Sequence, residues 1–146
     1  MDLSAAVGTT ATFSKTVSES DVYLFAGITG DLAPNHVNER FMKGTQYGRR
    51  IAHGALLVGY MSTASSMINA LMSERIPGIF PVSLGYDRLR FLGPVFFGDT
   101  ITVTYEVESI EAAKNRTLAK VNVTNDDDRT VAAAIHLMTW LPRDAA

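Results

Sequence analysis

The feature that most constrains the fold of this chain is a long uncharged stretch near its middle. Residues Ile51–Ser73 contain no Asp, Glu, Lys or Arg. Large apolar residues recur there at helical spacing, and the opposite face carries small residues. The stretch is long enough to cross a membrane, but it also contains a histidine, an asparagine, a threonine and four serines. We therefore expect a helix from about His53 to about Met72 that is packed on all sides in protein.

After this helix the pattern changes to a period of two residues, which indicates strands. The order of helices followed by strands predicts an α+β fold, with an antiparallel sheet wrapped around the long central helix. The length of 146 residues fits a single domain over residues 1–146. We also expect a first strand, a helix capped by Ser18 and a short helix that begins at Asn35 and ends by Gly44. The predicted strands are Ala11–Val17, Val82–Phe91, Thr100–Ile110, Thr117–Asn125 and Thr130–Leu141.

Composition excludes several classes of function. The net charge is −2 and no basic run is present, so a nucleic-acid surface is not indicated. The chain has no cysteine, which excludes disulfides and thiolate chemistry. The three histidines lack the close spacing of a zinc-binding pair, so no metal site is expected. The N-terminus lacks the pattern of a signal peptide, and we expect a cytoplasmic protein that binds no membrane.

Asp31 and His36 lie five residues apart, across a loop that Pro34 bends. Taken alone, Asp-x-x-Pro is more typical of a turn than of a catalytic site. A loop that doubles back can nevertheless direct a carboxylate and an imidazole to one point. Adding water to an α,β-unsaturated thioester requires such acid–base groups, and each proton transfer typically contributes ~10²–10⁴-fold in rate. Both interpretations stay open on spacing alone.

The start of the central helix offers a second functional candidate. A free backbone N–H there could stabilise a developing oxyanion, and Gly54 has no side chain to obstruct a substrate oxygen. His53 beside it is as typical of a capping or core residue as of a catalytic one. His136 falls in an alternating strand and is expected to be structural. Asp126-Asp127-Asp128 lacks the spacing of a calcium loop and predicts a solvated hairpin tip.

Two segments together resemble a known family. Gly30-Asp31-Leu32-Ala33-Pro34-Asn35-His36, followed by Tyr47-Gly48-Arg49-Arg50-Ile51-Ala52-His53-Gly54, resembles the motifs of the (R)-specific enoyl-CoA hydratases and related MaoC-like dehydratases. Residues 90–101 resemble the family's strand–turn–strand after the helix. The resemblance implies a hot-dog fold, no cofactor, and a homodimer or larger assembly with the site at a subunit interface. The implied substrate is an acyl thioester of CoA or of acyl carrier protein. The implied reaction is hydration of a trans-2-enoyl-CoA to an (R)-3-hydroxyacyl-CoA, or its reverse.

The resemblance also assigns roles to residues. Asp31 and His36 match the catalytic pair, and Gly54 matches the backbone donor to the thioester carbonyl. Ser62 matches a polar position that can support the catalytic Asp, and Asn35 and His53 are expected to support the site. Two positions depart from the family pattern, in which an Asn stands two residues after the Asp and an apolar residue precedes the His. Here these positions hold Ala33 and Asn35, so a short, polar or branched acyl group becomes as plausible as a fatty chain.

Cations near the site could bind the phosphates of CoA, although each is equally typical of a solvated surface. The candidates are Arg49, Arg50 and Arg88, with Lys43 and Arg90 as further possibilities. Two other functions remain as alternatives. One is a hot-dog acyl-CoA thioesterase, which typically needs a carboxylate on or near the central helix. The other is a non-catalytic subunit that binds acyl thioesters.

Overall fold

The computed structural model describes residues 2–143, which form one antiparallel sheet and one long helix with smaller helices at one end. The elements in chain order are η1 (Ser4–Ala6), β1 (Thr10–Thr16), α1 (Glu19–Thr29), α2 (Pro34–Val37), α3 (Glu39–Met42), α4 (Gly54–Arg75), β2 (Ile79–Phe91), β3 (Thr100–Glu111), η2 (Ala112–Lys114), β4 (Arg116–Thr124) and β5 (Thr130–Pro142).

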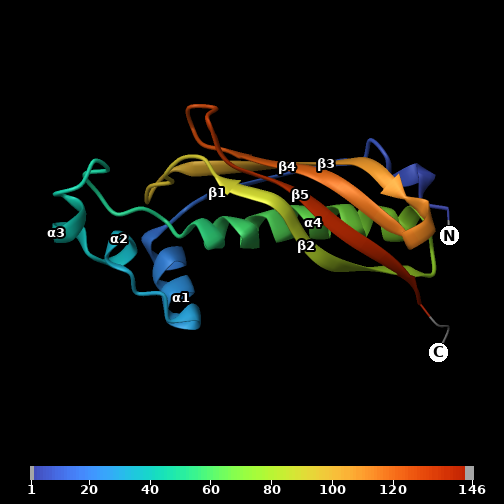
Figure 1. The fold of residues 1–146 in the computed structure, drawn as a ribbon, viewed down its shortest axis with the longest axis horizontal. Helices are drawn as coiled ribbons and strands as arrows, with labels where there is room; N and C mark the ends of the chain where they lie inside the picture. The colour runs from blue at the N-terminus through green and yellow to red at the C-terminus, as the bar shows by residue number, and fades with distance from the viewer. Residues whose placement is uncertain (1, 144–146) are drawn as a thin grey trace.

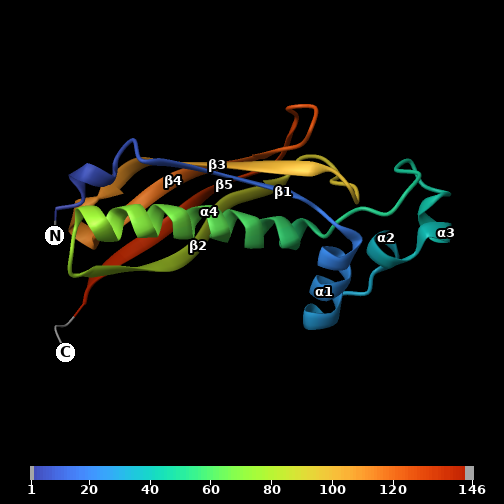
Figure 2. The same cartoon turned by 180° about the vertical axis from the view of Figure 1, so that it is seen from behind.

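The five strands pair in the order β1-β3-β4-β5-β2, and every pair is antiparallel. Figures 1 and 2 show the sheet curving along one side of α4, while α1, α2 and α3 lie beyond the N-terminal end of α4. This is the hot-dog arrangement, as the sequence predicts. β1 and β2 form the two edges of the sheet, and the β4–β5 hairpin reaches toward the end that carries the small helices (Figure 1).

The core lies between α4 and the concave face of the sheet. Alternate residues of β3 and β4 are buried, as expected for strands with one face on the core. On α4 the buried residues recur at helical spacing and form one stripe: Leu57, Tyr60, Met61, Ala64, Ser65, Ile68 and Met72. Burial of this apolar stripe against the sheet is the main contribution to the stability of the fold.

The prediction that α4 is packed on all sides is wrong for the single chain. The face opposite the buried stripe is open, and Met67 and Leu71 are 41% and 38% exposed there. Small uncharged residues do not distinguish a packed face from an open one, which explains the error. The small residues of the open face are Ala55, Gly59, Ser62 and Ser66.

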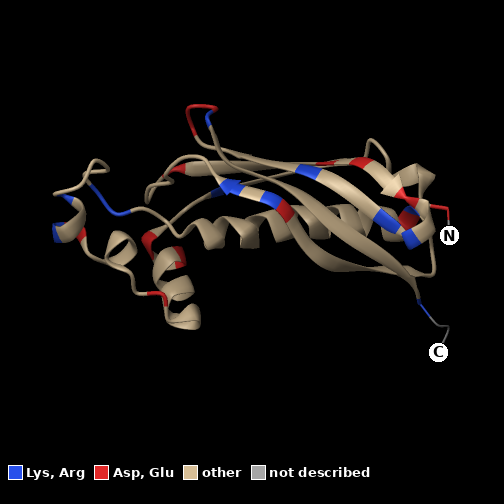
Figure 3. Ribbon diagram, in the orientation of Figure 1, with Lys and Arg blue, Asp and Glu red and all other residues tan. Residues whose placement is uncertain are grey.

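Among the described residues, α4 is the one helix whose length and mean hydropathy would allow it to cross a membrane. A core helix passes the same test, and α4 lies directly against the sheet (Figure 2). Figure 3 shows that α4 carries no charged residue before its last turn, whereas charges flank it on the small helices, the hairpin tip and the strands. The helix is therefore a core element of this fold.

The helix caps agree only partly with the sequence prediction. Ser18 and Asp21 form a capping box at the start of α1, as predicted. The helix expected between Asn35 and Gly44 is instead two short helices, α2 and α3, separated at Asn38. Asn38 adopts an extended backbone and its side chain caps α3 by accepting the N–H of Phe41. Asn35 lies inside α2 and is not a cap, which leaves its amide available for another contact.

Candidate active site

The loop from α1 to α2 presents Asp31 through a turn. Gly30 ends α1 in the left-handed region at φ 78°, where glycine carries no steric cost. Oδ1 of Asp31 accepts the N–H of Ala33 at 3.3 Å, and Pro34 begins α2. Oδ2 points toward His53, and the Asp31 side chain remains 50% exposed. One carboxylate oxygen therefore builds the turn while the other stays available to solvent or substrate.

His36 is held in a defined tautomer. Its Nδ1–H donates to the carbonyl oxygen of Ile51 at 2.8 Å, because that oxygen can only accept. Nε2 then carries the lone pair, which is the form that a general base requires. The side chain is buried at 7% exposure, and this burial, with a smaller repulsion from His53, lowers the pKa of His36 below its ordinary value. His36 is therefore a neutral imidazole at neutral pH.

His53 connects the two candidate catalytic residues. Its ring stacks on that of His36 with the centroids 3.7 Å apart. Its Nε2–H donates to the backbone carbonyl of Asp31 at 2.9 Å, and the same nitrogen lies 3.9 Å from Oδ2. His53 is almost fully buried, and Nδ1 has no hydrogen-bond partner in the described part of the chain. The residue fixes both the position of the Asp31 loop and the face of the His36 ring.

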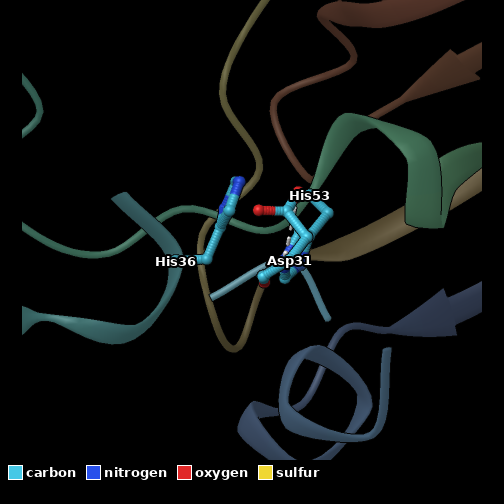
Figure 4. A group of neighbouring side chains, drawn as sticks. All are labelled: Asp31, His36 and His53. Atoms are coloured by element: carbon cyan, nitrogen blue, oxygen red, sulfur yellow. Dashed lines mark hydrogen bonds and ion pairs between the residues drawn. The ribbon is translucent and has the colours of Figure 1, made fainter. Parts of the chain in front are cut away.

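Figure 4 shows the three side chains gathered at the start of α4. One ligand atom from each of Asp31, His36 and His53 lies within 4.8 Å of the other two. A water molecule that makes two hydrogen bonds of about 2.8 Å can bridge atoms up to about 5.6 Å apart. The spacing therefore suits a single water held between the carboxylate and an imidazole.

The same group has the composition of a metal site, but its geometry is unsuited to one. A metal needs both imidazole nitrogens at about 2.0–2.1 Å with their lone pairs converging on it. The rings of His36 and His53 stack with only 26° between their planes, so their lone pairs lie in nearly parallel planes. Nε2 of His53 also donates to the Asp31 carbonyl. The arrangement favours hydrogen bonding to water over coordination.

Gly54 is the first residue of α4, so its N–H is among those that no carbonyl of the helix can accept. It lines a cavity of about 400 Å³ that also contains His36 and Asn35. A Cβ at this position would meet ring carbons of Phe91 at 2.7–2.8 Å. Glycine is thus required here for the close approach of Phe91 as well as for access to the N–H.

The β2–β3 loop closes the other side of this cavity, and the sequence did not predict a role for it. The N–H of Ala52 donates to the carbonyl of Val95 at 2.7 Å, which attaches the loop to the start of α4. Residues 90–101 resemble the family's strand–turn–strand and Gly93-Pro94 marks the turn, but only the fold brings this segment to His36. Phe91 at the end of β2 and the loop residues Leu92, Gly93, Pro94 and Val95 form this wall of the cavity, and Tyr47, Ile51, Ala52 and Leu57 complete the apolar lining.

Ser62 is not brought to Asp31 within this chain. It lies two turns along α4, about 12 Å from Gly54 by the helical rise, and faces solvent. Its carbonyl accepts the hydroxyls of Ser65 and Ser66. Within the described residues of the single chain, Ser62 therefore makes no contact that would support the catalytic Asp as predicted.

The three arginines proposed for CoA phosphates have different surroundings. Arg50 is mostly buried and pairs with Glu19 at 2.7 Å and Glu39 at 3.1 Å, so it holds α1 and α3 to the loop before α4. Arg88 lies in the left-handed region at a bulge of β2, beside a separate cavity that shares no residue with that of His36. These two are structural or remote in this chain.

Arg49 is more exposed and stacks over Phe96 at 3.9 Å, close to Asp99. It lines a second cavity of about 420 Å³ that also holds Arg129. This cavity shares Leu92, Gly93 and Pro94 with the first one. Arg49 therefore lies beside an extension of the candidate site.

His136 lies in the core, away from the cavity. It is fully buried, its Nδ1 hydrogen bonds to the hydroxyl of Tyr105 at 2.8 Å, and its Nε2 to that of Ser83 at 2.7 Å. The ring of Tyr86 stacks on it at 4.3 Å. Burial lowers the pKa of His136 to about 4. These contacts fit the structural role predicted for it.

Comparison with known proteins identifies the family. Residues 2–130 match the sequence profile described as the MaoC like domain. The chain belongs to the MaoC-like dehydratase family. A relative named (R)-specific enoyl-CoA hydratase from Rhodospirillum rubrum is 40% identical over 107 residues, which is 73% of this chain and 69% of the relative. A 3-hydroxybutyryl-CoA dehydratase from Methylorubrum extorquens is 38% identical over 75% of this chain and 65% of its own length.

Solved structures agree with the MaoC-like assignment. The (R)-hydratase from A. caviae superposes with a TM-score of 0.78 and 27% identity, covering 94% of this chain and 98% of that one. Members of the family with these names are hydro-lyases, and the fold and the family both match the prediction from sequence.

Proposed function

We propose that this MaoC-like protein hydrates a trans-2-enoyl-CoA to an (R)-3-hydroxyacyl-CoA, or catalyses the reverse dehydration, with Asp31 and His36 as its acid–base pair. The observation that carries the proposal is that Asp31 lies within 4.8 Å of His36, which lines one cavity together with Gly54 at the N-terminus of α4. The named hydratase and dehydratase relatives support the same reaction.

His36 is suited to take the proton from water. Its Nε2 bears the lone pair, because Nδ1–H is bound to the Ile51 carbonyl. A carboxylate oxygen of Asp31 lies within 4.8 Å of a ring nitrogen of His36, so it could accept the second hydrogen of a water held between the two side chains. The oxygen of this water would form a bond to Cβ of the substrate while its proton passes to Nε2. Both new bonds would then form on one face of the double bond, as in a syn addition.

The electron pair displaced from the double bond moves onto the thioester oxygen as Cβ is attacked. The N–H of Gly54, at the positive end of α4, would donate to this enolate oxygen. The proton held on Nε2 of His36 is then delivered to Cα, which restores the thioester and the neutral imidazole. The proton taken from water is the one that Cα needs, so the reaction balances without another donor.

The proposed test is direct. Mixing the protein with crotonyl-CoA should remove the absorbance of the conjugated enoyl thioester, and chiral analysis should identify (R)-3-hydroxybutyryl-CoA. Substituted and longer enoyl-CoA substrates extend the test. Asn35 places a polar side chain in the cavity lining, so a polar or branched acyl group is as plausible a substrate as a simple fatty chain. Absence of turnover across this panel would overturn the proposal.

The same assay separates the two alternatives. A thioesterase would release free thiol from an acyl-CoA, and a binding subunit would retain enoyl-CoA without turnover. The first acidic residue of α4 is Glu74, in its last turn and far from the cavity. This position does not favour a helix-borne carboxylate of the thioesterase type.

We further propose that the protein is a homodimer in the cytoplasm and that Arg49 contacts a phosphate of CoA. The unpaired edge strand β2 and the open face of α4 expose apolar side chains that a second copy would cover. Sedimentation should give twice the monomer mass, and a monomer would contradict the dimer. These side chains are Phe80, Val82, Leu84, Met67 and Leu71.

A further inference from the structure

The side chain of Asn35 hydrogen bonds to the nitrogen of His36 that the proposed reaction uses. Nδ2 of Asn35 lies 3.0 Å from Nε2 of His36. Nδ1–H of His36 is committed to the Ile51 carbonyl, so Nε2 is an acceptor and the amide N–H is the donor. The lone pair of the candidate base is therefore occupied by a neighbouring side chain.

The backbone holds this contact in place. The N–H of Ile51 donates to the carbonyl of Asn35 at 3.0 Å, while the side chain of His36 donates to the carbonyl of Ile51. Asn35 and His36, which both lie in α2, are thus attached to the segment that leads into α4. Asn35 is half-buried and lines the cavity, so its amide faces the space where substrate would bind.

We propose that Asn35 is a positioning residue for the base: its amide N–H donates to the Nε2 lone pair, holds His36 as the neutral ring, and yields that nitrogen to water when substrate binds. The first part rests on the contacts alone, and the second rests on the proposed function.

The physical consequence is a change in the protonation of His36. A donor to Nε2 stabilises only the neutral ring, so it disfavours the charged form. The other titratable groups that face His36 are Asp31 from the preceding loop, His53 from the start of α4 and Tyr47 across the cavity. The β2–β3 loop adds only apolar residues and glycine to this cavity. These groups are the same in a variant at position 35.

The test measures the pKa of His36 by NMR of the imidazole ring in the substrate-free protein. The chain has three histidines, so His36→Gln assigns the signal. Asn35→Leu removes the donor with little change in size and should raise the pKa by about half to one pH unit. Asn35→Asp replaces the donor with a negative acceptor and should raise it further, by about one to three units.

Asn38→Asp is the matched control. It adds the same charge three residues away, at an exposed cap of α3 that an Asp can also form, and should leave the pKa of His36 unchanged. An unchanged or lowered pKa in Asn35→Leu would overturn the proposal. A two-bond coupling between labelled Asn35 Nδ2 and His36 Nε2 should be present in the wild type and absent in Asn35→Leu.

Kinetics then distinguish this inference from the proposed function. The acid limb of kcat/KM should move to higher pH by the same amount as the pKa of His36, with about a threefold to tenfold loss of activity below both midpoints in Asn35→Leu. If the NMR pKa moves but the kinetic limb does not, the Asn35 contact stands and His36 is not the base.

Discussion

At the scale of single residues, His36 sets the pH at which the proposed reaction can run. Burial lowers the pKa of His36, with a smaller contribution from His53, while the Ile51 carbonyl and Asp31 oppose the change. The neutral ring is the active form, so activity is lost as pH falls through the pKa of His36. We therefore expect kcat/KM to fall at low pH with a midpoint below 6.5, the ordinary pKa.

A pH profile of crotonyl-CoA hydration in the wild type measures this midpoint. The stability of the protein should be measured in the same buffers, so that loss of activity by unfolding is distinguished from titration of His36. A midpoint above 6.5 would mean that another group controls the reaction or that the lone pair of His36 is stabilised differently from what its contacts indicate.

The sequence predicted which residues belong to the site better than it predicted the contacts that their side chains make. The two interpretations of Asp31, a turn and a catalytic carboxylate, turned out to be compatible, because Oδ1 builds the turn and Oδ2 does not. For Asn35 the sequence left two possibilities open, a helix cap or a polar group of the site; it is not a cap, and its amide contacts His36. A cap and a buried amide have the same sequence signature when helix boundaries are uncertain by a few residues.

At the scale of elements, the packing contact between the first residue of α4 and the last residue of β2 leads to a second prediction. Gly54→Ala would drive a Cβ against the ring of Phe91, which lies 2.7–2.8 Å from that position. We expect the free energy of unfolding to fall by about 1–3 kcal/mol, as for other overpacked sites. Activity should fall by about 10²-fold, because small misplacements at a reacting centre cost that much.

The double variant Gly54→Ala with Phe91→Ala identifies the cause. If the clash is responsible, urea denaturation should show that the double variant is more stable than Gly54→Ala alone, once the effect of Phe91→Ala is subtracted. A double variant that is no more stable than the single one would show that the ring is not what Gly54 accommodates.

The periods of helix and strand predicted the elements well, and the errors have physical reasons. The sequence prediction starts this strand at Val82, whereas β2 begins at Ile79 and includes Pro81. β2 is an edge strand, where the missing N–H of a proline is tolerated. The single helix predicted after Asn35 is divided because Asn38 leaves the helical region to cap α3.

At the scale of the whole molecule, the cavity depends on contacts between distant parts of the chain. The isolated bridge between Ile51 and Phe96 brings the β2–β3 loop to the α2–α4 region. No local pattern encodes such a pairing, so Phe91 and its neighbours could not be assigned to the site from sequence. Periodicity predicted the order of elements and the resemblance agreed with it, whereas the second wall of the cavity forms only when the chain folds.

His136 links the core to acid stability. Its pKa is lowered to about 4 in the folded chain from an ordinary value of 6.5, chiefly by burial. Between these values the unfolded chain binds a proton that the folded chain does not. The free energy of unfolding should therefore fall as pH decreases from 6.5 to about 4, by about 3 kcal/mol in total.

Urea denaturation at a series of pH values and a fixed protein concentration measures this loss. His136→Gln keeps hydrogen-bonding groups near Tyr105 and Ser83 but does not titrate, so its stability should depend less on pH. His36 contributes in the same direction, and a His36→Gln variant accounts for its share. An unaltered slope in His136→Gln would contradict the prediction.

The most direct test of the central claim is whether Asp31 and His36 act as one unit on one water. The measurement is kcat/KM for crotonyl-CoA hydration by Asp31→Asn, His36→Gln and the double variant, with the thermal unfolding of each variant as a control for folding. Each single variant should lose about 10²–10⁴-fold. The double variant should lose little more than either, because residues that act together are not additive. Near-wild-type activity in either folded single variant would contradict the account.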